Sequence, residues 1–144
     1  MPIISKKSRC AFHGLAYLAR TSNGSPVPFD EILDYITQQS SGPVLSSGYI
    51  AKIFQSVSRA GIVEAVSGPS GGYRLARRPG EIPLLEVVEV LDGPLVSRHE
   101  APLAEEDEGE TTCSVDEFIR ACEENVHESL ERSSVASLAP PPGP

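Results

Sequence analysis

The spacing of apolar residues along the chain predicts five helices and one β-hairpin. Five stretches have apolar side chains every three or four residues, which is the period of a helix with one buried face. These stretches are residues 8–22, 29–36, 46–61, 83–93 and 114–133. Residues 62–66 and 73–76 instead alternate between apolar and polar, and residues 67–72 between them are mostly Gly, Pro and Ser. This second pattern is typical of a β-hairpin.

Three helices followed by a hairpin is the order of a winged helix-turn-helix, in which the third helix enters the major groove of DNA. The predicted fold is therefore mainly α with a small β-hairpin, and residues 1–80 are expected to form the DNA-binding domain. Residues 81–138 are expected to form a helical dimerisation and sensor region with an acidic loop at 97–112, and residues 139–144 a disordered tail.

The last predicted helix has a narrow apolar stripe, which suits packing against a partner helix and predicts a homodimer. The stripe consists of Val115, Ile119, Cys122, Val126 and Leu130. Within it, Cys122 is expected to be a small buried hydrophobe.

The formal net charge of −8 is divided unevenly along the chain. Residues 1–80 carry nine Lys and Arg against four carboxylates, a net +5, whereas residues 81–144 carry three Arg against sixteen carboxylates, a net −13. A basic head joined to an acidic region is compatible with DNA binding by the head alone. No stretch approaches the roughly 20 apolar residues that span a bilayer, and no signal peptide is evident. The three irregularly spaced cysteines argue against a secreted disulfide framework, so we expect a cytoplasmic protein without a membrane partner.

The third predicted helix and the hairpin carry the candidate contacts to double-stranded DNA. Lys52, Ser56 and Arg59 recur at spacings of four and three, so they share one exposed face, and each is a donor or a cation suited to base edges or phosphates. Glycines in the hairpin allow close approach to the DNA backbone. The predicted DNA-binding residues are Ser46, Ser47, Tyr49, Lys52, Ser56, Arg59, Gly71, Gly72, Tyr73 and Arg74.

These motifs resemble the Rrf family of bacterial winged-helix transcription regulators, which includes IscR and NsrR. The resemblance covers about residues 3–138, and its most specific element is residues 59–63 followed by 68–73. It implies dimers joined through the long C-terminal helix, palindromic promoter sites and, in many members, an iron–sulfur cluster that tunes DNA affinity. Ser67 stands where members often carry an arginine for the minor groove, so that contact is missing or comes from Arg74.

The cluster is where the sequence departs from the family. Members with a cluster usually have three closely spaced cysteines before the last helix, and here only Cys113 matches, with Asp116 where some members have a histidine. His13 falls where certain relatives place a histidine ligand, and Cys10 lies on the same side of that helix, whereas Arg9 replaces a carboxylate ligand. A composite site of Cys113 with His13, Cys10 or Asp116 is one hypothesis. The sequence favours the other, a regulator without a cofactor.

Three alternatives remain open to different degrees. A thiol sensor at Cys113 is disfavoured because neighbouring carboxylates oppose the thiolate. A winged-helix module that grips a protein and not DNA is compatible with the acidic C-terminal half. An enzyme is the least favoured of the three, because no P-loop, Gly-x-Ser-x-Gly or His-Glu-x-x-His motif is present and nothing orients Cys113 and His127 as nucleophile and base.

Overall fold

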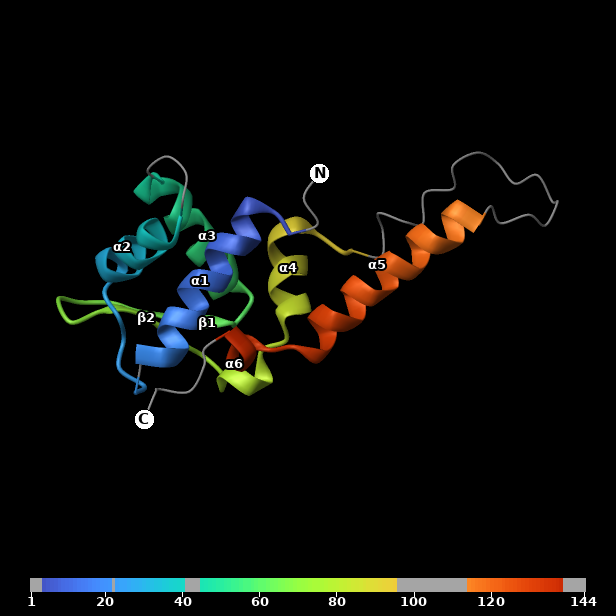
Figure 1. Cartoon of the computed structure of the whole chain (residues 1–144). Helices are drawn as coiled ribbons and strands as arrows, with labels where there is room; N and C mark the ends of the chain where they lie inside the picture. The colour runs from blue at the N-terminus through green and yellow to red at the C-terminus, as the bar shows by residue number, and fades with distance from the viewer. Residues whose placement is uncertain (1–3, 22, 41–44, 96–113, 139–144) are drawn as a thin grey trace.

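The computed structural model describes residues 4–21, 23–40, 45–95 and 114–138. Its first half has the predicted order of three helices and a hairpin (Figure 1). The elements are α1 (Lys6–Thr21), α2 (Phe29–Gln39), α3 (Ser47–Arg59), β1 (Val63–Val66) and β2 (Gly72–Leu75). The predicted winged helix-turn-helix, mainly α with a small hairpin, is therefore confirmed, and its element boundaries differ from the predicted ones by at most three residues.

The start of α1 is held by a serine cap and by α4 (Leu84–Asp92). The Ser5 hydroxyl oxygen accepts a hydrogen bond from the Ser8 backbone N–H at 3.1 Å, so Ser5 is the residue that satisfies a free N–H of the first turn. Ser8 is fully buried, and its hydroxyl donates to the Asp92 carboxylate at 2.7 Å. The Ser5 hydroxyl also lies 2.7 Å from the same carboxylate. The C-terminal end of α4 is thus tied to the N-terminal end of α1.

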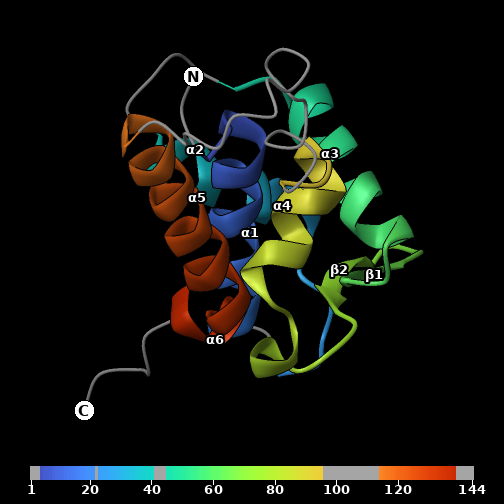
Figure 2. The same ribbon diagram turned by 90° about the vertical axis from the view of Figure 1, so that its right-hand side faces the viewer.

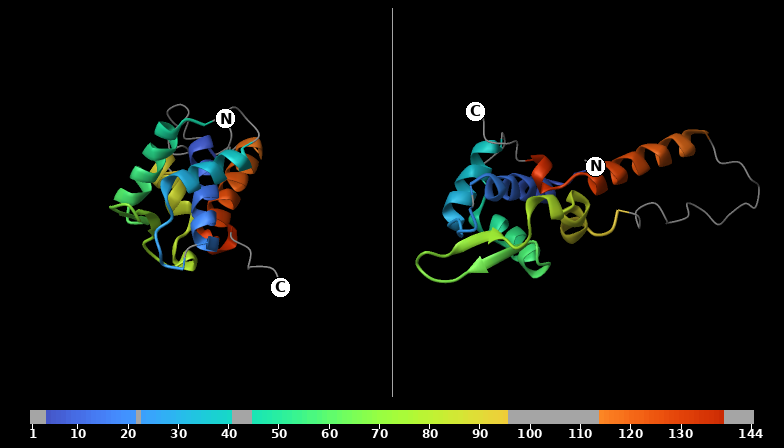
Figure 3. Two further views of the ribbon diagram at one scale, coloured as in Figure 1. Left: turned by 90° about the vertical axis from the view of Figure 1, so that its left-hand side faces the viewer. Right: turned by 90° about the horizontal axis from the view of Figure 1, so that it is seen from below.

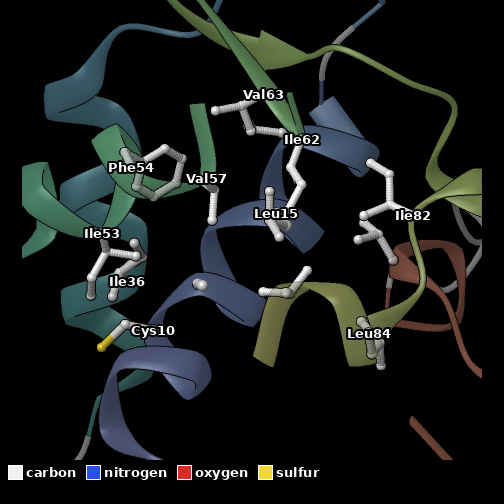
Figure 4. Close-up of a cluster of buried hydrophobic side chains, with 14 of the residues drawn as sticks. Cys10, Leu15, Ile36, Ile53, Phe54, Val57, Ile62, Val63, Ile82 and Leu84 are labelled. Atoms are coloured by element: carbon white, nitrogen blue, oxygen red, sulfur yellow. The ribbon is translucent and has the colours of Figure 1, made fainter. Parts of the chain in front are cut away.

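The third helix crosses α1 closely because a glycine lies at the crossing. A methyl group at Gly14 would lie 2.6 Å from Cζ of Phe54, and Phe54 is fully buried in the core. The Ser46 hydroxyl oxygen accepts from the Tyr49 backbone N–H at 3.1 Å and so caps α3. Ile50, Ile53, Phe54 and Val57 form the buried face of the helix, as predicted. Figure 4 shows this core, which includes Leu15 of α1 and Ile62 before β1.

The wing contains a third extended segment that the sequence pattern did not predict. In the hairpin, Val63 pairs with Leu75 and Val66 with Gly72. On the other side of β2, the Val27 backbone N–H donates to the Tyr73 carbonyl at 2.8 Å, and the Tyr73 N–H donates to the Val27 carbonyl at 2.9 Å. A methyl group at Gly72 would lie 2.0 Å from the Val27 carbonyl oxygen. This pairing therefore requires glycine at position 72.

The C-terminal part of the described chain returns to the same core. A 3₁₀ helix, η1 (Pro79–Glu81), precedes α4, and a short helix, α6 (Val135–Leu138), follows α5 (Ser114–Arg132); neither short element was predicted. The Leu84 N–H donates to the Ser133 carbonyl, and the Val135 N–H donates to the Ile82 carbonyl, both at 3.0 Å. These bonds fix the base of α5 to the segment between the wing and α4. Residues 1–80 and 81–138, predicted as two regions, contribute side chains to one hydrophobic core. The boundary at residue 80 therefore does not separate two cores.

The long helix α5 and the wing extend from opposite sides of the molecule. In Figure 1 and in the right-hand view of Figure 3, α5 projects away from the body and the hairpin extends at the other end. Figure 2 shows α3 and the wing on one side, α5 on the other, and α1 and α4 between them. Among the described helices, none is both long and apolar enough to cross a membrane.

Candidate nucleic-acid interface

The outer face of α3 presents the two predicted cations to solvent. Lys52 and Arg59 are exposed and are seven residues apart, so they lie on one face of the helix. Ser56 is half-buried, and its hydroxyl donates to the Lys52 backbone carbonyl at 3.1 Å. A hydroxyl used in this way is less available for a base. The sequence pattern places Ser56 on this exposed face but does not show that its donor is already used by the Lys52 carbonyl.

Gln55, which is not among the predicted DNA-binding residues, lies on the same face. Gln55 is exposed and is three residues after Lys52 and four before Arg59, the spacings of neighbours on a helix surface. The same periodicity that selected Lys52 and Arg59 was sufficient to find it. The face of α3 that can meet DNA therefore carries two cations and one amide.

The first turn of α3 contributes polar groups with structural roles of their own. Ser46 and Ser47 are exposed, but the Ser46 hydroxyl oxygen caps the helix. Tyr49 is half-buried, and the Nζ of Lys6 lies 5.6 Å from its ring centroid. Burial raises the pKa of the Tyr49 phenol, which therefore remains a neutral donor. Lys6 brings the basic start of α1 beside the first turn of α3.

In the wing, the predicted contact residues pack and pair within the molecule. The Tyr73 ring packs near two aromatic rings, and its centroid lies 5.1 Å from that of Phe54 and 6.5 Å from that of Phe29. The Arg74 Nε donates to the Glu64 carboxylate at 2.9 Å across the hairpin, and this guanidinium holds the pKa of Glu64 below its usual range. DNA contact by these wing residues stays a prediction, and Glu64 competes with phosphate for Arg74.

The glycines of the wing are explained by contacts inside the protein. A methyl group at Gly71 would lie 2.1 Å from the Val66 carbonyl oxygen, and Gly72 faces Val27 as described above. Close approach to DNA was the predicted reason for both glycines. The turn and the third extended segment already require them, so their presence does not by itself indicate a DNA contact.

The residues proposed for a metal site do not form one in the described part of the chain. Cys10 is only 5% exposed and packs in the apolar core near Ile36 and Ile53 (Figure 4). Burial raises the pKa of its thiol, whereas a metal ligand must be a thiolate. His13 is half-buried, and burial together with Arg9 lowers its pKa. Cys113 lies outside the described residues, among which no group of three His, Cys, Asp or Glu side chains could hold a metal.

The exposure of α5 shows that the predicted burial of Cys122 would need a partner molecule. Cys122 is exposed in the single chain and not buried. Its neighbours on the N-terminal half of α5 are also exposed, with fractions of 59% for Val115, 70% for Phe118 and 47% for Ile119. Near the other end of the helix, Leu130 is buried against the chain's own core. We call Val115, Phe118, Ile119 and Cys122 the α5 stripe. The periodicity predicts an apolar face on α5. The chain's own core covers this face only near Leu130, towards the C-terminal end of the helix.

The fold and the α3 face define a winged helix-turn-helix protein. The model of the Rrf2 family, described as iron-dependent transcriptional regulators, matches residues 4–141. The chain belongs to this family, as the sequence motifs predicted.

Curated relatives match about two thirds of the chain. BadM of Rhodopseudomonas palustris, a putative HTH-type transcriptional regulator, is 29% identical over 94 residues, which cover 65% of this chain and 58% of that protein. IscR of Aliivibrio salmonicida is 32% identical over 89 residues, which cover 62% and 49% respectively. The chain thus spans about half to three fifths of the length of these relatives. Their names are those of transcriptional regulators, which agrees with the prediction that this chain is not an enzyme.

Solved structures match nearly the whole chain. CymR, the global cysteine regulator of B. subtilis, has a TM-score of 0.75 at 25% identity, covering 96% of this chain and 97% of its own. IscR of T. potens has a TM-score of 0.70 at 21% identity, covering 95% and 85%. These similarities confirm the fold, including the long helix after the wing.

Although the family is described as iron-dependent, we expect this chain to contain only substoichiometric iron and sulfide when purified without oxygen. Cys10 is buried in the core. The sequence has only two other cysteines: Cys122, which is exposed on α5, and Cys113, which lies outside the described residues. Iron and sulfide analysis with an absorption spectrum measures this directly. Near-stoichiometric iron and sulfide, lost in Cys113→Ser but kept in the control Cys122→Ser, would contradict the prediction.

Proposed function

We propose that this chain is a homodimeric transcription regulator that binds a palindromic DNA site through α3 and the wing. The observation that carries the proposal is the outer face of α3, where Lys52, Gln55 and Arg59 are exposed side by side. Within the described residues none of the three makes a side-chain hydrogen bond or ion pair. A helix with free donors and cations, next to a wing, is suited to the major groove.

The α5 stripe supports a dimer in which a second copy covers it. An apolar face with a 70% exposed Phe118 at its centre is costly in water, and a helix of 19 residues can cover the same face of its copy in a self-complementary pair. Because the base of α5 is bonded to the segment that follows the wing, the pairing would set the distance between the two α3 helices. Two such helices, about one turn of DNA apart, read the halves of a palindrome.

A signal that tunes DNA binding would act where α1 meets the end of α4. Asp92 ends α4 and accepts hydrogen bonds from Ser5 and Ser8 of the α1 start. Lys6, in the same turn of α1, lies over Tyr49 of α3. A change in the segment after α4 can therefore reach the DNA-binding face through two contacts. A redox or iron signal is one candidate. A bacterial regulator that binds DNA would act in the cytoplasm.

The proposed function is tested by the salt dependence of binding. We expect the full chain to retain duplexes from fragmented bacterial DNA, with an affinity that falls steeply as salt is raised, because bound cations release counterions from phosphates. Fluorescence anisotropy over a series of salt concentrations gives the slope. The alternative, a module that grips a protein partner, predicts no retained duplex. A weak complex with a flat salt response would also contradict the proposal.

A further inference from the structure

The outer face of α3 is asymmetric around Gln55. On the helix surface its neighbours at three and four residues are Lys52 and Ala51 on the N-terminal side and Ser58 and Arg59 on the C-terminal side. Two of these neighbours are small and two are cationic, and the small ones lie on the flank away from the cations. Such a face lets the helix backbone approach the floor of a groove on one flank while the cations reach phosphates or guanine on the other.

The side-chain amide of Gln55 has no hydrogen-bond partner among the described residues. It is exposed, and in the described ranges no hydrogen bond, ion pair or ring contact involves its side chain. By contrast, the Ser56 donor is used by the Lys52 carbonyl, and Arg74 is paired with Glu64. A free glutamine offers a carbonyl acceptor and an NH₂ donor on one rigid group, so it can make two hydrogen bonds at once.

We propose that Gln55 reads an adenine in the major groove and makes an A·T pair a requirement at the centre of each half-site. Adenine presents an acceptor at N7 and a donor at N6, which match the donor and acceptor of the glutamine amide, whereas lysine and arginine match guanine or phosphate. Gln55 is thus a specificity-determining residue of the face, and Lys52 and Arg59 bind phosphate or guanine around it. The inference rests on the proposed function, since it requires α3 to lie in the major groove.

The test is a selection of short randomised duplexes by the full-length chain, followed by titration of the selected duplex and of versions with each base pair replaced. Wild type should enrich one A·T pair in each half-site. Gln55→Ala should lose about tenfold to a hundredfold of the preference at that pair alone. Gln55→Glu should turn the preference toward C·G there, because glutamate accepts a hydrogen bond from cytosine N4.

The readout is the ratio of affinities for two duplexes, so a uniform loss from the added charge of Gln55→Glu does not imitate a loss of specificity. Gln38→Ala is the matched control, because it is the same truncation at an exposed position of α2, and it should leave the selected sequence unchanged. Equal base preferences in wild type and Gln55→Ala would overturn the proposal while the proposed function stands. A wild type that enriches no duplex would overturn the proposed function itself.

Discussion

A chain with Phe118 replaced by glutamate is expected to be monomeric and to lose most of its affinity for DNA. Phe118 is 70% exposed on the α5 stripe, beside Val115 and Ile119, so the change does not disturb the chain's own core. In a dimer, the new carboxylate would be buried in an apolar contact without a partner, which costs several kcal/mol. Because two linked heads bind a double site about 10²–10⁴-fold more tightly than one, loss of the dimer should weaken DNA binding by a similar factor.

Sedimentation velocity measures the first effect and DNA titration the second. The matched control is Arg120→Ala, which shifts the net charge by the same one unit at an exposed position of the same helix. Arg120 lies two residues from Phe118, nearly opposite it around the helix, so this variant should remain dimeric. A Phe118→Glu chain that sediments as a dimer would show that the interface lies elsewhere.

The parts of the fold that the sequence predicts are those whose causes are local. Helix α3 is an example, because its Ser46 cap, its apolar face and the Gly61 that follows its end lie within sixteen consecutive residues. The hairpin is another, since turn residues separate two short alternating runs. Both are determined by neighbouring residues, and pattern analysis places them to within a residue or two.

The pairing of Val27 with Tyr73 was not predictable in the same way. It joins two residues 46 positions apart in the sequence, and Val27 stands alone between two prolines without any alternating pattern. The only trace in the sequence is Gly72, where a methyl group would strike the Val27 carbonyl oxygen. The sequence pattern indicates close approach to DNA at Gly72, whereas the structure shows close approach of the distant segment around Val27. Such ambiguity is resolved only when the two segments are seen together.

In the candidate site too, features with local causes are predictable and features that depend on distant residues are not. Periodicity identifies which side chains of α3 share a face, so Lys52 and Arg59 were found, and Gln55 was available by the same rule. Periodicity does not reveal which donors are already used, and this is why Ser56 and Arg74 seemed equivalent to Lys52. The Glu64 partner of Arg74 lies ten residues away across the hairpin, and only the strand register brings the two together.

For the α5 stripe, periodicity predicts an apolar face but does not identify the molecule that covers it. Leu130 packs on the chain's own core, whereas Phe118 and Cys122 do not. Burial therefore changes along α5. The C-terminal end of the helix is buried because backbone hydrogen bonds hold residues 133 and 135 against residues 84 and 82. A helix fixed at its base and projecting beyond the core (Figure 1) leaves its far end for another molecule. In the proposed dimer, this geometry would connect the dimer contact mechanically to the DNA contact, since α5 is bonded to the segment that follows the wing.

Replacement of Arg59 by alanine is expected to weaken binding to the selected duplex about tenfold or more at moderate salt. Arg59 is exposed at the end of α3, and a guanidinium in the major groove either pairs with guanine or neutralises a phosphate. A guanine contact is worth about 1–3 kcal/mol and its loss relaxes specificity at one position, whereas loss of a phosphate contact weakens all sequences and reduces the salt slope by about one.

The same titration in several salt concentrations, on the selected duplex and on an unrelated one, separates these two roles of Arg59. The matched control is Arg20→Ala, because Arg20 is also an exposed arginine in the last turn of its helix. Both arginines therefore interact with the dipole of their helix in the same way, and both replacements should change helix stability by a similar amount. Arg20 lies over the Tyr35 ring on α2 and outside the α3 face, so its loss should leave affinity nearly unchanged. If Arg59→Ala bound as tightly as wild type, α3 would not be the helix that enters the groove. The assignment of Lys52, Gln55 and Arg59 as DNA contacts would then be wrong as well.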